Sequence, residues 1–141
     1  MTIDIHAAAP ADAAAVLALW IEAETHPTIT DDLESVDRLL AHDPGALLVA
    51  VADGMVVGSV IAGWDGWRGS IYRLAVHPAF RRSGVGQSLV RAAEQRLREL
   101  GARRFQAYVA GDDAQAMGFW GQSGWEEQRR TTRFVSEQVA T

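Results

Sequence analysis

Residues 69–86 read GSIYRLAVHPAFRRSGVG, and this stretch decides how the rest of the chain is interpreted. Its first half is apolar and β-branched, which predicts a strand over 70–76 that His77-Pro78 ends. Its second half carries two arginines and two glycines ahead of a helical pattern. A helix N-terminus offers unpaired backbone N–H groups and the positive end of a dipole, so this loop is typical of a pyrophosphate site.

A plainer interpretation competes with the phosphate site, namely a glycine turn that caps an ordinary core helix, because short glycine patterns recur by chance. A dinucleotide-binding loop is disfavoured, since its third glycine would fall at Leu89. A Walker-type loop is excluded, because all thirteen basic residues are arginine and that loop needs a lysine. Arg81 and Arg82 supply the charge that two phosphates require.

Hydrophobic periodicity predicts the remaining elements. We expect strands over 3–7, 46–52, 55–62, 105–109 and 125–135, and helices from Pro10, over 33–42, over 84–100 and over 113–121. The first helix is expected to bury Val16, Leu17, Trp20 and Ile21. Asp53-Gly54 predicts a tight hairpin, and Gly101 a helix end. Strands and helices that share a mixed sheet give an α/β fold of the α+β mixed-sheet kind, in a single domain over 1–141.

Composition excludes several classes of protein. The chain has 141 residues, a net charge of −5 and no cysteine, which removes disulfides, thiolate zinc sites and cysteine nucleophiles. Its acidity argues against nucleic acid as a partner. No metal motif occurs, so we expect chemistry without a metal. No apolar run reaches the roughly 18 residues of a membrane span, and no signal peptide is evident, so we expect no membrane partner and a cytoplasmic location.

The run LAVHP at 74–78, followed by Arg81, Gly84 and Gly86 in RxxGxG spacing, resembles the acyl-CoA signature of the GNAT superfamily of N-acetyltransferases. The likeness extends over nearly the whole chain. The stretch from Gly63 to Gly86 further resembles a bacterial subgroup of small, single-domain acetyltransferases that carry a Gly-x-Asp-Gly-x-Arg-Gly segment before the cofactor strand. The resemblance implies a twisted, mostly antiparallel central sheet with flanking helices.

The resemblance also implies which residues bind acetyl-CoA. The backbone of Leu74, Ala75 and Val76 would lie along the pantetheine, and the Val76 N–H would face the thioester oxygen. The pyrophosphate loop would comprise Arg81, Arg82, Ser83, Gly84, Val85, Gly86 and Gln87. Asp113 and Trp120 would complete the cofactor site, although family members often carry Asn and Tyr there. The Phe119-Trp120 and Gly124-Trp125 pairs resemble late aromatic motifs of the family.

The catalytic assignment is less direct, because Trp120 cannot act as the acid that a tyrosine would provide. Either the coenzyme A thiol, with a pKa near the ~8.5 of cysteine, leaves unaided, or Tyr72 or Tyr108 protonates it. Four carboxylates are candidates for the base, namely Glu24, Asp31, Asp32 and Asp65. Asp65 is slightly favoured because Trp64 and Trp67 flank it, although a turn role is common for Asp before Gly. The expected catalytic set is therefore Val76, Asp65 and Tyr108.

The resemblance therefore implies an enzyme that transfers acetyl from acetyl-CoA to a primary amine by direct attack in a ternary complex. The amine would belong to a small molecule or a peptide. The alternative is a non-catalytic acyl-CoA-binding or regulatory module, motivated by Trp120 and by the lack of a clear base. A general nucleotide-phosphate binder is a second rival. Trp64 and Trp67 would line an acceptor pocket or pack on a partner subunit, and the latter is compatible with a homodimer.

Overall fold

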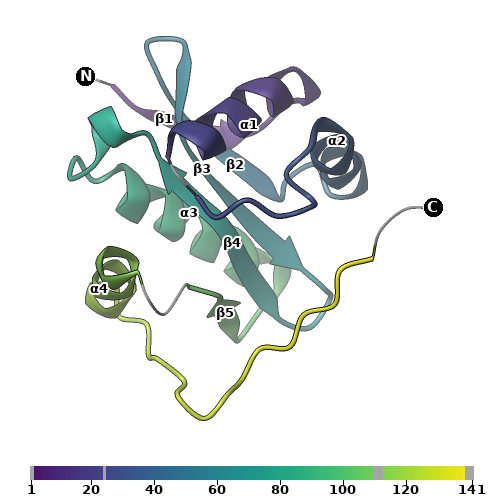
Figure 1. The fold of residues 1–141 in the computed structure, drawn as a ribbon, viewed down its shortest axis with the longest axis vertical. Helices are drawn as coiled ribbons and strands as arrows, with labels where there is room; N and C mark the ends of the chain where they lie inside the picture. The colour runs from purple at the N-terminus through teal and green to yellow at the C-terminus, as the bar shows by residue number, and fades with distance from the viewer. Residues whose placement is uncertain (1, 24, 110–112, 139–141) are drawn as a thin grey trace. The chain divides into compact units, whose positions relative to one another are not determined.

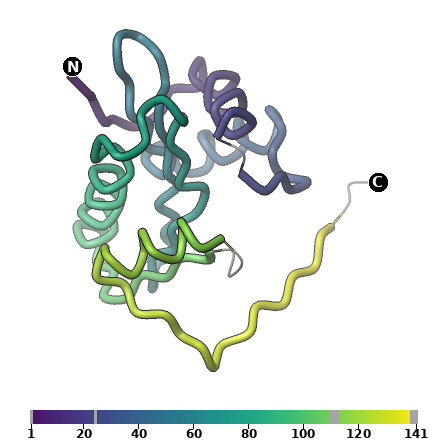
Figure 2. Tube along the Cα trace, turned by 60° about the vertical axis from the view of Figure 1, so that its left-hand side comes forward, coloured from purple at the N-terminus to yellow at the C-terminus, as the bar shows by residue number. Residues whose placement is uncertain are grey.

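The computed structural model describes residues 2–23, 25–109 and 113–138. The chain forms two compact units, Met1–Tyr108 and Val109–Thr141. The first unit holds a sheet with helices on both of its faces, and the second holds one helix and the C-terminal segment (Figures 1 and 2). The single-domain organisation stays a prediction.

A five-stranded sheet, in the order β1-β2-β3-β4-β5, forms the centre of the first unit. Its strands are β1 (Asp4–Ala7), β2 (Leu47–Ala52), β3 (Met55–Trp64), β4 (Gly69–Val76) and β5 (Phe105–Ala107). The first four strands are antiparallel neighbours, and β5 runs parallel to β4. Asp53 and Gly54 turn the β2–β3 hairpin with positive φ values of 50° and 76°. The mixed, mostly antiparallel sheet and its tight hairpin are confirmed.

Helices cover both faces of this sheet. A short 3₁₀ turn, η1 (Pro10–Asp12), leads into α1 (Ala13–Glu22), and α1 packs with α2 (Leu33–His42) on one face. The opposite face carries α3 (Val85–Leu100). Gly58 marks that face, because a Cβ there would come 2.8 Å from Leu89 Cδ1. Its neighbour Ser59 points the other way and contacts Trp20 of α1.

The buried stripe of α1 differs in part from the prediction. The buried residues of this helix are Ala13, Val16, Leu19 and Trp20. Leu17 is partly buried, whereas Ile21 is 79% exposed, so its predicted burial is wrong. The physical reason is the helical period, because the positions 13, 16 and 20 define a face from which residue 21 is rotated by about 100°.

Glycines delimit α3 at both ends. Gly84 precedes the helix with φ 85°, and Gly101 follows it with φ 107° and donates its N–H to the last turn. The predicted start and stop are therefore confirmed. The expected core positions Val85, Leu89, Ala93 and Leu97 are all buried, whereas Leu100 is 44% exposed.

The second unit corrects the prediction for the C-terminal region. It contains α4 (Ala114–Gln122), close to the predicted helix. The described residues that follow, 123–138, form no strand, so the closing strand predicted over 125–135 is wrong. An alternating pattern favours a strand only where a neighbour completes the ladder. The strand predicted over 105–109 is likewise shorter, because β5 ends at Ala107.

Candidate acyl-CoA site

A β-bulge interrupts β4 in its middle. Ser59 pairs with Ala75, and Ile61 pairs with Tyr72, so two residues of β4 lie opposite one residue of β3. Arg73 occupies the bulge with φ 50°, a left-handed conformation that is uncommon for residues other than glycine. Because a bulge bends its strand and increases its twist, it redirects the second half of β4.

The second half of β4 has one open edge. β5 pairs with β4 only at Gly69, Ser70 and Ile71, and no other strand among the described residues pairs with that edge. On the opposite edge the His77 N–H donates to the Val57 carbonyl at 2.8 Å. Hydrogen bonding alternates along an antiparallel strand. The amides at 74 and 76 therefore point away from β3, toward the open edge.

A compact loop joins the open strand to α3. It starts with a 3₁₀ turn, η2 (Pro78–Phe80), and the Ser83 hydroxyl donates to the Phe80 carbonyl. Arg82 then adopts φ 64° and Gly84 φ 85°. Ser88 donates the first hydrogen bond of α3, to Gly84 O at 3.0 Å, so the N–H groups at 85 and 86 precede the helical ladder.

This loop has the geometry of an anion site. Backbone N–H groups in a left-handed turn form a concavity that attracts phosphates, and the helix dipole adds to the attraction. No atom outside the neighbouring residues lies within 4 Å of a Cβ built at Gly84, so a ligand can approach the backbone there. The arrangement fits a pyrophosphate whose attached chain continues along the open edge of β4.

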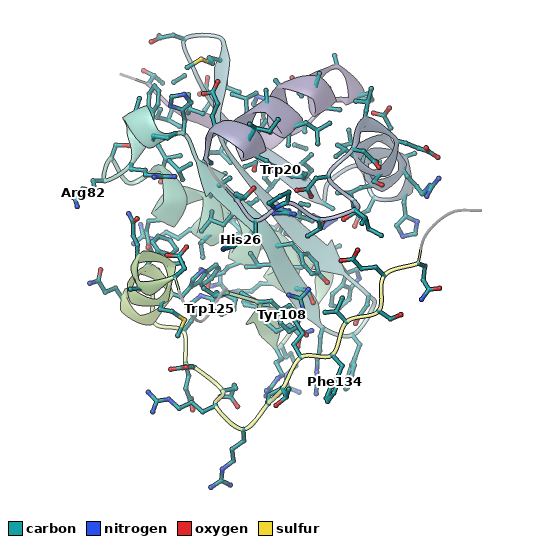
Figure 3. The ribbon with its side chains drawn as sticks, viewed as in Figure 1. Trp20, His26, Arg82, Tyr108, Trp125 and Phe134 are labelled. Atoms are coloured by element: carbon teal, nitrogen blue, oxygen red, sulfur yellow. The ribbon has the colours of Figure 1, made fainter. Side chains whose placement is uncertain are left out.

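The two arginines of the loop have different surroundings. Arg81 Nη2 donates to the Ala23 carbonyl at 3.0 Å, so its guanidinium braces the C-terminal end of α1. Arg82 is exposed, and its side chain extends outward from the loop (Figure 3). Arg82 can therefore turn toward a phosphate without breaking a contact, whereas Arg81 holds the loop to α1.

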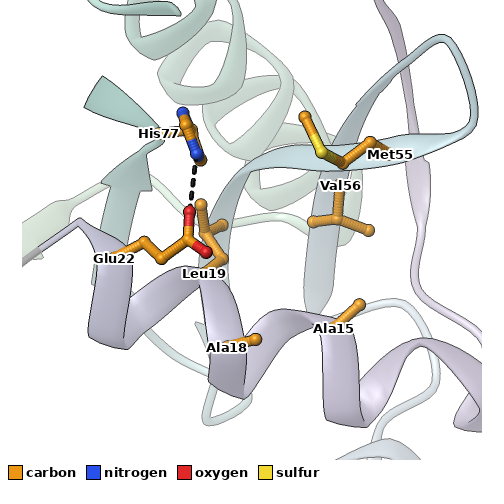
Figure 4. A pocket seen from close by; sticks show the side chains of 7 residues that line it. All are labelled: Ala15, Ala18, Leu19, Glu22, Met55, Val56 and His77. Atoms are coloured by element: carbon orange, nitrogen blue, oxygen red, sulfur yellow. Dashed lines mark ion pairs between the residues drawn. The ribbon is translucent and has the colours of Figure 1, made fainter. Parts of the chain in front are cut away.

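His77 provides a second link between this loop and α1. Its Nδ1 accepts the Ala79 N–H at 3.1 Å, and its Nε2 lies 2.6 Å from Glu22 Oε2. The acceptor role of Nδ1 places the hydrogen on Nε2, which donates to the carboxylate. The pair borders a small pocket of about 170 Å³ whose other lining is apolar, contributed by α1 and by Met55 and Val56 of β3 (Figure 4).

The expected cofactor residues fall in both units. Leu74, Ala75, Val76 and the loop 81–87 lie consecutively at the open edge and the start of α3. Asp113 and Trp120 belong to the second unit. There Asp113 caps α4 by accepting the Ala116 N–H at 3.0 Å, and the Trp120 ring packs edge-on against Trp125 with centroids 4.9 Å apart. The cofactor roles of these two residues stay predictions.

Asp65 has the turn role that the sequence left open. Its Oδ1 accepts the N–H groups of Trp67 at 2.8 Å and Arg68 at 2.7 Å. The hydrogen bonds from the backbone of Arg68 and then of Trp67 lower the pKa of the Asp65 carboxyl below its ordinary 3.8. Asp65 also lies beyond the Gly69 end of β4, and seven residues of extended chain, about 23 Å, separate Gly69 from Val76. Its role as base stays a prediction.

The other candidate carboxylates that the structure describes are also engaged. Asp31 pairs with Arg73 at 2.6 Å. Asp32 caps α2 by accepting the Ser35 N–H at 2.8 Å, and this bond lowers the pKa of the Asp32 carboxyl. Glu24 lies outside the described residues. Tyr108, 47% exposed, follows β5 directly at the point where β4 and β5 separate (Figure 3).

Sequence reasoning missed Arg73. The apolar pattern predicts only a strand position for this residue, yet it forms the bulge and makes four hydrogen bonds to the chain segment after α1. The available signal was the charge itself, because an arginine inside IYRLAV needs a partner if it is buried.

Among the residues that the structure describes, no three His, Asp or Glu side chains gather as metal ligands. No helix of the described part has the length and apolarity needed to cross a membrane.

A mixed sheet that opens beside a bulged strand, followed by a glycine-rich helix start, fits the acyl-CoA-binding arrangement expected from the sequence. The family model described as Acetyltransferase (GNAT) family matches residues 13–125. The acetyltransferase ECA0875 of Pectobacterium atrosepticum is 37% identical over 109 residues, which cover 77% of each chain. The chain belongs to the GNAT acetyltransferase family.

Solved structures share the fold at lower identity. The PaiA N-acetyltransferase of Thermoplasma acidophilum, solved with coenzyme A, superposes with a TM-score of 0.79 at 16% identity, covering 91% of this chain and 92% of that one. The aminoglycoside N-acetyltransferase AAC(6')-Iy, also solved with coenzyme A, gives a TM-score of 0.71 at 20% identity, covering 98% and 95%. The mixed sheet with its flanking helices is thus a GNAT fold.

Proposed function

We propose that this protein transfers the acetyl group of acetyl-CoA to a primary amine by direct attack within a ternary complex. The observation that carries the proposal is the open edge of β4, which a short 3₁₀ turn joins to the Gly84 loop and the start of α3. The exposed amides of β4 could thus bind the pantetheine, and the start of α3, which follows in the chain, could bind the pyrophosphate to which the pantetheine is attached. The coenzyme A complexes of two relatives with this fold support the same cofactor class.

The backbone of this chain would bind most of the cofactor. The backbone of residues 74–76 would lie along the pantetheine as a neighbouring strand does, with the Val76 N–H kept for the thioester, and the amides at the start of α3 would hold the phosphates. Arg82 would add a positive charge beside them. An acidic protein can therefore bind a polyanion, because the attraction is local.

The Val76 N–H would donate to the thioester oxygen while the amine nitrogen bonds to the carbonyl carbon. A fixed donor aimed at the oxygen where negative charge develops can lower the barrier by roughly 3 kcal/mol. The carbon–sulfur bond then breaks, and the proton that the amine loses is finally found on the thiol of coenzyme A. Tyr108, placed where β4 and β5 separate, is our candidate for delivering that proton. A thiol of pKa ~8.5 also leaves without help.

The acceptor that we propose is an amine of a small molecule or of a peptide. One relative is an aminoglycoside N-acetyltransferase, which supports a small-molecule amine, and a peptide amine fits the same chemistry. A cytoplasmic location and a homodimer stay predictions. The non-catalytic alternative is favoured by one observation, which is that the candidate bases Asp31, Asp32 and Asp65 are all held in hydrogen bonds.

Calorimetric titration with acetyl-CoA, coenzyme A, ATP and NAD tests the cofactor assignment. We expect selective binding of acetyl-CoA, and about a 100-fold loss in Gly84→Glu or Gly86→Asp, because each adds negative charge where phosphates bind. Gly54→Glu is a matched control, because Gly54 also has positive φ and open space but lies in the β2–β3 turn. Unchanged affinity in a folded Gly84→Glu variant would refute the site.

A screen of amines, in which release of the coenzyme A thiol is measured, then distinguishes an enzyme from a binding module. Turnover with any amine supports the transferase. Selective binding of acetyl-CoA without turnover across aminoglycosides, polyamines, amino acids and peptides would favour the module.

A further inference from the structure

The connection between α1 and α2 is held by a small set of local hydrogen bonds. Residues 25–32 contain neither helix nor strand. Thr25 Oγ1 donates to the Trp20 carbonyl at 3.1 Å, and Thr28 donates to Asp31 through its N–H at 3.3 Å and its hydroxyl at 3.2 Å. The Asp31 N–H also donates to the Thr28 carbonyl at 3.1 Å, so these bonds join the connection to itself and to the end of α1 and not to the sheet.

Arg73 joins the connection to the sheet from the bulge of β4. Its Nη2 lies 2.6 Å from Asp31 Oδ1 and 2.7 Å from Oδ2. Its Nη1 donates to the His26 carbonyl at 2.9 Å, and Nη2 also reaches Thr28 Oγ1 at 3.3 Å. The Arg73 and Asp31 side chains are only 17% and 14% exposed. A pair so shielded from water holds its partners more firmly than a surface ion pair does.

The backbone and the side chain of Arg73 are fixed together. The guanidinium lies 5.2 Å from the centroid of the Trp20 ring. Trp20 Nε1 donates to Ser59 Oγ at 2.9 Å, and that hydroxyl donates to the Arg73 carbonyl at 3.2 Å. The left-handed backbone of Arg73 is therefore supported by a buried chain of hydrogen bonds. The same residue that bends β4 thus orders the connection after α1.

The position of this contact relates it to the proposed reaction. Arg73 precedes Val76 by three residues, about 10 Å of strand, on the side away from the pyrophosphate loop. A cofactor whose phosphates lie at 82–87 and whose pantetheine follows β4 would direct its thioester toward the bulge. The connection after α1 crosses the sheet over β3 and β4 in Figure 1, and His26 lies over the middle of the sheet in Figure 3.

We propose that Arg73 is a positioning residue that clamps residues 25–31 as a wall of the acceptor site. The inference rests on the proposed transfer to an amine. Arg73 acts through Asp31 and His26 and does not contact the reacting atoms. The clamp sets how the acceptor is held, while the backbone edge at 74–76 sets how the cofactor is held. Acceptor binding should therefore respond to Arg73 more strongly than cofactor binding does.

Hydrogen exchange of the full chain tests the clamp itself. In Arg73→Gln and in Asp31→Asn we expect amides within 25–31 to exchange about tenfold faster, because the segment opens locally at lower cost. Exchange in α3 should not change. Arg38→Gln is the matched control, because it removes an ion pair with Glu34 that is exposed, at 74% and 82%. The double variant Arg73→Gln/Asp31→Asn should be no worse than either single variant.

Steady-state kinetics with the best amine from the screen tests the role in the reaction. Arg73→Gln should raise the KM for the amine about tenfold and leave kcat and the Kd for acetyl-CoA within about twofold of the unmodified protein. Arg73→Lys should restore the KM only in part, because an ammonium group lacks the planar fork of a guanidinium.

Each other outcome overturns a definite part of the inference. Unchanged exchange in 25–31 refutes the clamp. A loss of acetyl-CoA affinity parallel to the rise in KM would show that Arg73 supports the cofactor strand instead. A collapse of kcat in Asp31→Asn alone would make Asp31 the base. If the unmodified protein acetylates no amine, the proposed function fails, and the exchange result still decides whether the clamp exists.

Discussion

Gly58 of β3 allows α3 to lie close against the sheet. A Cβ at this position would come 2.8 Å from Leu89 Cδ1 and 3.0 Å from Val85 Cγ1. Both side chains are buried, at 0% and 3% exposure, so neither has free space into which to move. We expect Gly58→Ala to reduce the free energy of unfolding by about 1–3 kcal/mol, the usual cost of overpacking a core. At roughly 3 °C per kcal/mol, the Tm should fall by about 3–9 °C.

The same substitution should also weaken cofactor binding. Val85 is the first residue of α3, so an outward shift of the helix moves the amides that would hold the phosphates. Urea unfolding and calorimetric titration with acetyl-CoA measure the two effects. Leu89→Val should compensate, because it removes the methyl group nearest the new Cβ, and the pair should be less damaging than the sum of the single variants.

A matched control is Gly118→Ala in α4. No atom lies within 4 Å of a Cβ built at Gly118, and alanine favours a helix over glycine, so stability should rise by up to about 1 kcal/mol. If Gly58→Ala unfolds and binds acetyl-CoA as the unmodified protein does, the close approach of α3 to β3 does not limit either property, and the reasoning is refuted.

Two further predictions concern buried and titrating polar groups. Ser59→Ala leaves the buried Trp20 N–H without its acceptor and should lower the free energy of unfolding in urea by about 1–3 kcal/mol. The loss should be smaller in a Trp20→Phe background, which lacks that N–H. Equal losses in both backgrounds would contradict the shared hydrogen bond. Asp32 and Asp65 have pKa values lowered from 3.8 by backbone hydrogen bonds, so their stabilisation is complete above that value and is lost as the pH falls through the folded-state pKa. The stability difference between the unmodified protein and Asp32→Asn/Asp65→Asn should therefore shrink from about pH 7 to about pH 3, and a constant difference would argue against it.

The central motif of the chain could be predicted from the sequence because its signals are local. The Asp53-Gly54 hairpin, the glycine before α3 and the apolar period of that helix each fit in one short window, and the structure contains all three. The Ile21 error arose because positions 16, 17, 20 and 21 also fit one helical stripe, whereas the buried stripe of α1 is centred on positions 13, 16 and 20. Ile21 lies outside this stripe and is exposed.

The bulge and its clamp could not be predicted from local patterns. Arg73 meets Asp31 across 42 positions of sequence and His26 across 47. Such a contact depends on the register of β3 and β4 and on the path of residues 25–32, whose sequence has no hydrophobic periodicity that would predict it. The strand expected over 125–135 failed for a related reason, because a ladder partner is a property of the fold and not of the segment.

The extra residue in β4 also has a consequence for how this gene can change. Two residues of β4 lie opposite one residue of β3, so the strand has one residue more than a regular ladder needs. Removing Arg73 or Leu74 would leave a regular ladder in which Ser59 still pairs with Ala75, and the amides beyond the bulge would keep their direction. Such a deletion would remove the bend of β4, whereas a substitution there changes one side chain at a time.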